Sequence, residues 1–211
     1  MPSPREAWVR REIVAGCATA LHRIGGPTLP SVGITSCLRG EGRTSVALAA
    51  AVVERYAYGR TTILVELDLE NASLAGTLGV SPGPGVVEVL GGTASLADAL
   101  QWPDERLGVL VAGKVDGMPS SLLSRLAGGD LLRQVGSMAE VVVSDLPALP
   151  PAGLGLHVAG LCSTVLLVVR AGVTPIGHIQ KAVVALEKPP WVVLNATGTK
   201  VPRWMRAILG R

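Results

Sequence analysis

The chain has 211 residues, a length typical of a single α/β domain that buries a complete core. Hydrophobic residues make up 48% of the sequence and charged residues only 17%, which excludes a disordered chain and favours strands buried on both faces. The formal net charge of +3 comes from scattered residues, and this argues against nucleic acid as a partner.

The first predicted element is an amphipathic helix over residues 5–23. The GGPTLPS segment that follows contains paired glycines and two prolines, which cannot extend that helix. Residues 1–30 are therefore predicted to form an N-terminal helix and linker, and residues 31–211 the α/β domain.

From residue 31 onward, apolar strand-like runs alternate with helix-like runs. Strands are predicted at residues 32–36, 62–68, 107–112, 140–146, 164–170 and 190–196, and helices at 44–58, 85–90, 120–126, 130–138, 152–161, 175–186 and 202–209. Strands this uniformly apolar, separated by helix-length segments, predict right-handed βαβ units. The expected fold class is α/β, with a three-layer, doubly wound, mostly parallel sheet.

One window, residues 151–169, has no charged residue and imitates a membrane span. Three glycines interrupt it, and its β-branched residues gather in the second half. We therefore interpret it as a short helix that leads into a buried strand.

The cysteines Cys17, Cys37 and Cys162 lie far apart and are odd in number. They support neither a disulfide framework nor a metal site. Charges interrupt the N-terminal segment before any apolar stretch long enough for a secretory signal, so a cytoplasmic location is expected.

The segment SCLRGEGRTS, residues 36–45, lies between a predicted strand and a predicted helix. In a phosphate-binding loop at such a place, glycines allow close backbone approach, the helix start offers N–H donors, and a hydroxyl binds magnesium. Arg43 stands where such loops carry lysine. The candidate nucleotide-binding residues are Arg39, Gly40, Glu41, Gly42, Arg43, Thr44 and Ser45.

Two further predicted strands end in acids. The run ILVELD ends in Glu66 and Asp68, and VVVSD ends in Asp145. Because the carboxyl ends of parallel strands meet at one edge of a sheet, we expect these acids beside the loop. Thr44 and Asp145 are the candidate magnesium ligands. The candidate catalytic residues are Arg43, Glu66, Asp68 and Asp145.

Several segments, in one order along nearly the whole chain, resemble the cytoplasmic domain of bacterial tyrosine kinases of the CpsD/CapB type. These are deviant-Walker P-loop proteins related to MinD and ParA. The segments are SVGITSCLRGEGRTSVALAAAVVE, ILVELDLENASLAGTLGV, GVVEVLGG, VVVSDLPAL, VLLVVRAGVTPIGHIQKAVVAL and VVLN. The resemblance implies a P-loop NTPase-like domain at residues 31–211 that uses ATP or ADP with magnesium. It also implies that residues 1–30 are an oligomerisation element, in a homo- or hetero-oligomer.

Departures from the family pattern fall on its catalytic positions. The family's loop reads like PGEGKS, so Arg39 replaces the proline and Arg43 the lysine. Its second motif reads like IDADLRRP, so Glu66 stands for the first Asp, Asp68 matches the second, and Glu70 replaces the Arg.

Its third motif reads like IDTPP, so Asp145 is retained and Leu146 replaces the Thr. The family often ends in a tyrosine cluster that it phosphorylates, whereas the only tyrosines here are Tyr56 and Tyr58.

Two interpretations of Arg43 are open. Arginine keeps the charge of lysine but carries a wider, planar head. It can turn toward Asp145, Glu66 or Asp68 as an internal substitute for the ligand, or it can bind phosphate while Thr44 and Asp145 hold magnesium. The number of altered positions favours weak nucleotide binding and weak or absent hydrolysis.

The resulting hypothesis is a degenerate kinase-like protein, a regulatory or binding subunit in exopolysaccharide or capsule synthesis or export. The resemblance implies a membrane chain-length or export protein, or an active kinase paralogue, as partner at the inner face of the cell membrane. An active ATPase or tyrosine kinase that tolerates Arg43, and a MinD- or ParA-like positioning protein, are the alternatives.

Two smaller signals have plain interpretations. His22, His157 and His178 share no metal-ligand spacing and are predicted to lie on the surface or on helices. Trp204 with the neighbouring arginines favours a packed C-terminal helix over a membrane-binding tail.

Overall fold

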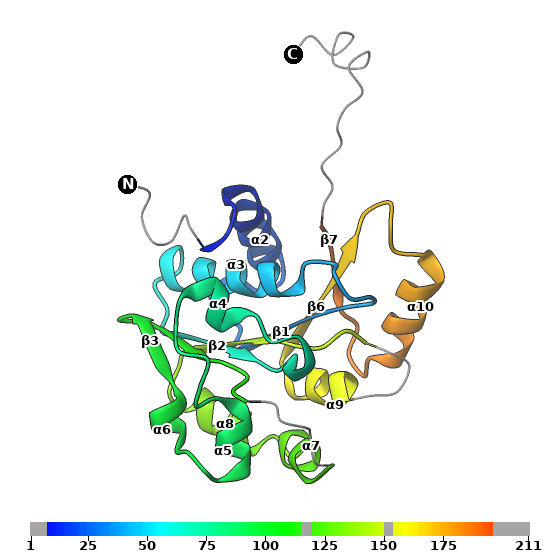
Figure 1. Cartoon of the computed structure of the whole chain (residues 1–211). Coiled ribbons are helices and arrows are strands. Elements are labelled where there is room, and N and C mark those ends of the chain that lie inside the picture. The colour runs from blue at the N-terminus through cyan, green and yellow to red at the C-terminus, as the bar shows by residue number, and fades with distance from the viewer. Residues whose placement is uncertain (1–7, 115–119, 150–153, 196–211) are drawn as a thin grey trace, which may run out of the picture.

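The computed structural model describes residues 8–114, 120–149 and 154–195 (Figure 1). The helix predicted at residues 202–209 and the first residues of the helix predicted at 5–23 lie outside these ranges.

A seven-stranded sheet forms the centre of the molecule. Its strands are β1 (Ser31–Ser36), β2 (Thr62–Glu66), β3 (Gln101–Asp104), β4 (Leu107–Leu110), β5 (Val141–Asp145), β6 (Thr164–Arg170) and β7 (Trp191–Asn195). The order across the sheet is β3-β4-β2-β5-β1-β6-β7, and every neighbouring pair is parallel except β3 and β4. The predicted doubly wound, mostly parallel α/β fold is confirmed.

Helices cover both faces of this sheet (Figure 1). The α-helices are α2 (Arg11–Arg23), α3 (Arg43–Tyr56), α4 (Leu74–Leu78), α5 (Val86–Gly91), α6 (Leu96–Ala99), α7 (Ser120–Ala127), α8 (Asp130–Gly136), α9 (Leu154–Leu161) and α10 (Ile176–Ala185). Two short 3-10 helices are η1 (Gly26–Thr28) and η2 (Leu69–Asn71).

The core divides into two halves because successive strand side chains point to opposite faces. In β6, Leu166 and Val168 join the core half under α2, α3 and α4. Val165 and Leu167 join the other half, which packs against α5 and α7 to α10. All four are buried, which explains why the strand reads as an unbroken apolar run.

Helix α3 is buried on nearly all sides because it lies between the sheet and α2 (Figure 1). It follows β1 directly, so its N-terminus lies at the carboxyl edge of the sheet. Leu21 and Cys17 of α2 are buried against it, so the described part of the N-terminal helix docks on its own domain.

The structure corrects one predicted element and adds others, among them the short helices α4 and α6, which were not predicted. The N-terminal helix is not continuous from residue 5, because the backbone of Arg10 is extended before α2 begins at Arg11 and the Val9 side chain turns into the core. Strand β3 was not predicted. It is a short, half-exposed edge strand that contains Pro103, and proline gives no strand signal although an edge tolerates it.

The charge-free window 151–169 contains α9 followed by the buried strand β6, as interpreted from its glycines. Within the described ranges, no helix combines the length and the apolar character needed to cross a membrane.

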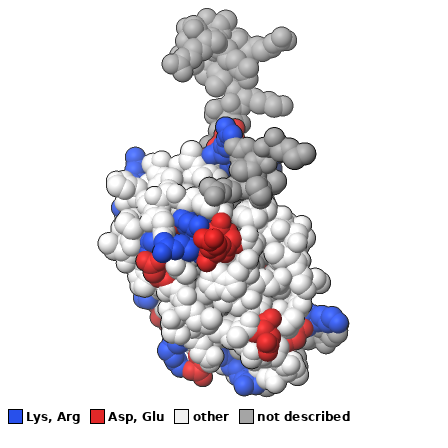
Figure 2. Space-filling model, turned by 90° about the vertical axis from the view of Figure 1, so that its left-hand side faces the viewer, with Lys and Arg blue, Asp and Glu red and all other residues white. Residues whose placement is uncertain are grey.

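The three histidines lie exposed on α2, α9 and α10, as predicted. On the β3 side of the molecule, basic side chains lie beside acidic ones (Figure 2).

Candidate functional site

The loop between β1 and α3 has the backbone shape of a phosphate-binding loop. Gly40 and Gly42 have φ of 77° and 91°, in the left-handed region that favours glycine. Gly42 is also the N-cap of α3, so the free N–H groups of the first helical turn face the loop. The predicted location of the loop, at the carboxyl edge of the sheet, is correct.

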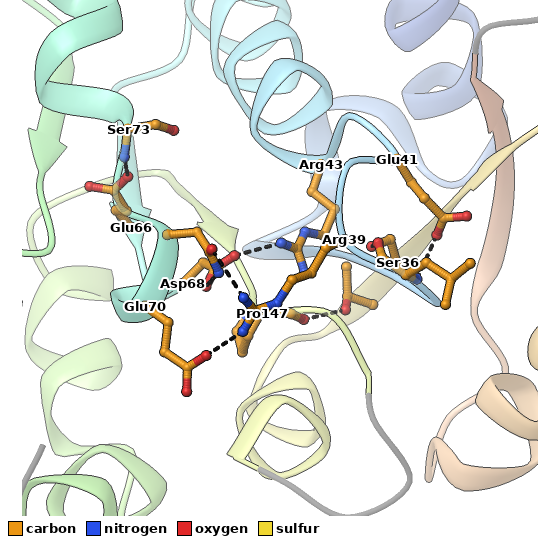
Figure 3. A network of polar contacts seen from close by, with 12 residues as sticks. Ser36, Arg39, Glu41, Arg43, Glu66, Asp68, Glu70, Ser73 and Pro147 are labelled. Carbon is orange, nitrogen blue, oxygen red and sulfur yellow. Dashed lines mark hydrogen bonds and ion pairs between the residues drawn. The ribbon is translucent and has the colours of Figure 1, made fainter.

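Glu41 holds the loop in shape from the side away from Arg43 (Figure 3). Its buried carboxylate accepts hydrogen bonds from the Leu38 N–H at 2.8 Å and from the Thr174 hydroxyl. Its backbone carbonyl accepts one from Asn195 Nδ2 at 2.8 Å. The Glu41 side chain therefore acts on the loop itself.

Arg43 pairs with Asp68. Its Nη2 atom lies 2.5 Å from Asp68 Oδ2, and both side chains are less than 10% exposed. Asp68 is fixed further by Asn71, whose Nδ2 donates to Asp68 Oδ1 at 3.0 Å. The other terminal nitrogen of Arg43, Nη1, is buried without a hydrogen-bond partner among the described residues.

A second arginine of the loop makes a parallel contact at the surface. Arg39 Nη2 lies 2.5 Å from Glu70 Oε2, and both side chains are about two-thirds exposed. Figure 3 shows Arg39 and Arg43 extending from the loop toward the same segment, residues 68–71. Two ion pairs thus join the loop to the chain that follows β2.

The Glu66 carboxylate accepts hydrogen bonds from backbone N–H groups. Its Oε1 accepts from the N–H groups of Ser73 at 2.5 Å and Leu74 at 2.9 Å, and its Oε2 accepts from Ala112 at 3.0 Å. It therefore ties the end of β2 to the start of α4 and to the segment after β4. Three backbone donors leave this carboxylate little capacity for a ligand.

Asp145 differs from Glu66 in its hydrogen-bond partners. It pairs in register with Glu66 on β2 and with Ile34 on β1, and it is 1% exposed. Neither carboxylate oxygen has a hydrogen-bond partner within the described ranges. Burial, the largest cause, raises the pKa of Asp145 to about 7, although the neighbouring Thr44 hydroxyl and the Arg43 charge lower it.

These residues fit magnesium in part. An unpartnered, buried carboxylate beside a hydroxyl is an oxygen donor set of the kind that magnesium takes. Thr44 and Asp145 would hold the ion, and bound magnesium would neutralise phosphate charge. In the described ranges no cluster of three His, Cys, Asp or Glu side chains could hold a metal ion by itself.

The structure brings most of the predicted site residues to one place. Arg43 pairs with Asp68, and Arg39 pairs with Glu70 of the same segment. Thr44 lies half-buried near Asp145, and Ser45 is exposed. Of the three acids predicted as possible partners of Arg43, the structure shows an ion pair with Asp68.

Sequence reasoning assigned no role to Asn195 or Thr174. Asn195 is the last residue of β7 and Thr174 lies shortly after β6, at the same edge of the sheet, and both form hydrogen bonds to Glu41. A Cβ at Gly42 would overlap the Asn195 amide, so this contact needs glycine there for a second reason. In the sequence each is a single polar residue near the end of an apolar run, and this pattern is too common to indicate a role.

The chain was compared with known proteins. No protein-family model matches it. Tyrosine-protein kinase CpsD of Streptococcus agalactiae is 28% identical over 162 residues, which cover 74% of this chain and 67% of CpsD. Succinoglycan biosynthesis transport protein ExoP of Rhizobium meliloti is 31% identical over 154 residues, or 68% of this chain but 19% of ExoP.

Solved structures agree with these relatives. The VpsO kinase domain has a TM-score of 0.75 and 28% identity, and the match covers 87% of this chain and 94% of that domain. MinD of Pyrococcus horikoshii, solved with Mg-ADP, has a TM-score of 0.63 at 22% identity, over 84% of this chain and 76% of MinD, and supports the fold alone. The relatives of this chain thus include proteins named as tyrosine-protein kinases and one named for succinoglycan biosynthesis transport. Its structural neighbours include tyrosine-kinase domains and MinD ATPases.

Proposed function

We propose that this chain is a degenerate P-loop protein that binds nucleotide weakly and hydrolyses it poorly or not at all. Its role is that of a regulatory or binding subunit in bacterial exopolysaccharide or capsule synthesis or export. One observation carries the proposal: the cationic side chain at the lysine position of the loop, Arg43, is held by a carboxylate of the same chain.

The physical reason is the charge balance of phosphoryl transfer. Catalysis of that reaction depends on positioning and on neutralising charge that develops on the transferred group. Arg43 can reach a phosphate with its full charge only if it leaves a buried ion pair with Asp68. Glu66, at the position of the family's first Asp in its second motif, is saturated by backbone donors.

The cellular role rests on the relatives. One is named for succinoglycan biosynthesis transport and others are named tyrosine-protein kinases. The partner we propose is a membrane protein of polysaccharide chain-length control or export, or an active kinase paralogue. The protein would then act as an oligomer at the inner face of the cell membrane, held there by that partner.

A second candidate, an active ATPase or kinase that tolerates Arg43, is favoured by one observation. Asp145 and Arg43 Nη1 are both buried and unpartnered within the described residues, as expected of groups that receive a metal ion and a phosphate.

Calorimetric titration of Mg-ATP into the wild type, Arg43→Lys and Arg43→Ala, with phosphate release measured on each, separates the two candidates. We expect weak binding by the wild type. In Arg43→Lys we expect at least about tenfold tighter binding, because a lysine follows the family's loop pattern. Micromolar binding by the wild type that disappears in Arg43→Ala would contradict the proposal, and turnover by that wild type would establish the second candidate.

A further inference from the structure

Two carboxylates after β2 occupy the two arginines of the loop. Asp68 takes Arg43 in the buried interior, and Glu70 takes Arg39 at the surface (Figure 3). Asp68 is well anchored, because its N–H donates to the Asp145 carbonyl at 3.1 Å and its second oxygen accepts from Asn71. The Asp68 carboxylate therefore holds a fixed position against which Arg43 packs.

The surface pair consists of two departures from the family pattern. Arg39 stands at the proline of that loop and Glu70 at the arginine of the second motif, and the two side chains contact each other at 2.5 Å. Each change alone would leave an unmatched charge at the rim of the site. Together they form a complementary pair.

The buried pair leaves part of Arg43 unused. A guanidinium presents a planar fork that matches two anionic oxygens, and Asp68 contacts only Nη2. Nη1 is buried and has no partner in the described part of the chain. A ligand with several adjacent anionic oxygens would satisfy both nitrogens of Arg43, which the present contact does not.

We propose that Asp68 and Glu70 are specificity-determining residues, and that an anionic ligand binds at Arg43 and Arg39 by exchange with these two carboxylates. The inference rests on the proposed function and deepens it. The ligand class is a di- or triphosphate. A single phosphate can replace only one of the two carboxylates, so the second arginine would stay paired with its own carboxylate. The site then discriminates against monophosphates, since displacing the buried pair needs more than one new contact.

Calorimetric titration of inorganic diphosphate, without divalent metal, tests the exchange. Asp68→Asn keeps the shape of the side chain and an oxygen for Asn71 but removes the charge that holds Arg43. We expect its affinity for diphosphate to exceed that of the wild type by at least about tenfold. Glu70→Gln should gain about two- to threefold, because an exposed pair contributes little. Inorganic phosphate should show a smaller gain with Asp68→Asn.

Two controls separate exchange from a general change of charge. At about pH 8.5, where Asp145 is ionised, Asp145→Asn removes a buried negative charge of the same site without breaking either arginine ion pair. Asp130→Asn breaks another exposed ion pair, with Arg133 on α8. Circular dichroism and thermal unfolding report whether each variant is folded. We expect neither control to match the gain of Asp68→Asn.

The outcomes are distinct. A gain in Asp68→Asn that exceeds the gain in Asp145→Asn supports exchange. Measurable binding by the wild type with no gain in Asp68→Asn, or with an equal gain in Asp145→Asn, overturns exchange and leaves the proposed function standing. If the wild type, Asp68→Asn and Arg43→Lys all bind neither diphosphate nor Mg-ATP, the proposed function is overturned and exchange with it.

Discussion

The two halves of the site differ in how their charges are paired. On the metal side, Asp145 is buried beside Thr44 and has no hydrogen-bond partner among the described residues. On the phosphate side, Arg39 and Arg43 are both held by carboxylates of the same chain. The carboxylate that would bind a cation makes no ion pair among the described residues, whereas the arginines that would bind an anion are paired with carboxylates of the same chain.

This difference places the ion pairs of the candidate site on its phosphate side. Asp145 ends a central strand, where it lies beside Glu66 in the sheet and makes no ion pair among the described residues. Asp68 lies two residues beyond the end of β2, where the chain can reach the loop. The Arg43 side chain extends far enough to contact it, so the cation nearest the start of α3 is paired within the chain.

The largest expected effect comes from breaking the phosphate side. Arg43→Met leaves Asp68 buried without its counter-charge, and we expect it to lower the free energy of unfolding by about 3–5 kcal/mol. The matched variant Arg39→Met breaks an exposed pair and should cost less than about 1 kcal/mol. Urea denaturation of both variants measures this. Equal losses in the two would show that the buried and exposed pairs do not differ as described.

A smaller effect of opposite sign is expected on the metal side. Burial raises the pKa of Asp145 to about 7, so the buried carboxylate opposes folding above that pH. At about pH 8.5, Asp145→Asn should raise the free energy of unfolding of the metal-free protein by about 1–2 kcal/mol. Asp130→Asn, at an exposed position, should stay within about 0.5 kcal/mol of the wild type. Urea denaturation in the presence of a chelator measures both. A loss of stability in Asp145→Asn would mean that its carboxylate is already paired in the free protein.

Most of the fold could be predicted, because the parallel strands are buried on both faces and read as apolar runs. Strand β3 could not, because it is half-exposed and interrupted by proline. The break in the helix before α2 could not be predicted, because the feature found there is the burial of the Val9 side chain, which is a tertiary contact.

The candidate residues could be placed together from the sequence because strand ends converge at one edge of the sheet, a rule that needs no coordinates. The choice among three acids as the partner of Arg43 was not predictable. It depends on backbone donors near Glu66 that come from α4 and from the segment after β4, both distant in the sequence. The role of Asn195 likewise depends on a contact across the sheet edge.

We propose that Asp68 holds Arg43 until an anionic ligand takes the place of the Asp68 carboxylate. The most direct measurement is the position of the Arg43 guanidinium in crystals grown without nucleotide and then soaked with Mg-ADP. We expect salt-bridge contact with Asp68 in the first state, and in the second a guanidinium that has left Asp68 for the phosphates. A guanidinium already directed into the empty loop, or bound ADP with the Arg43–Asp68 pair intact, would contradict the claim.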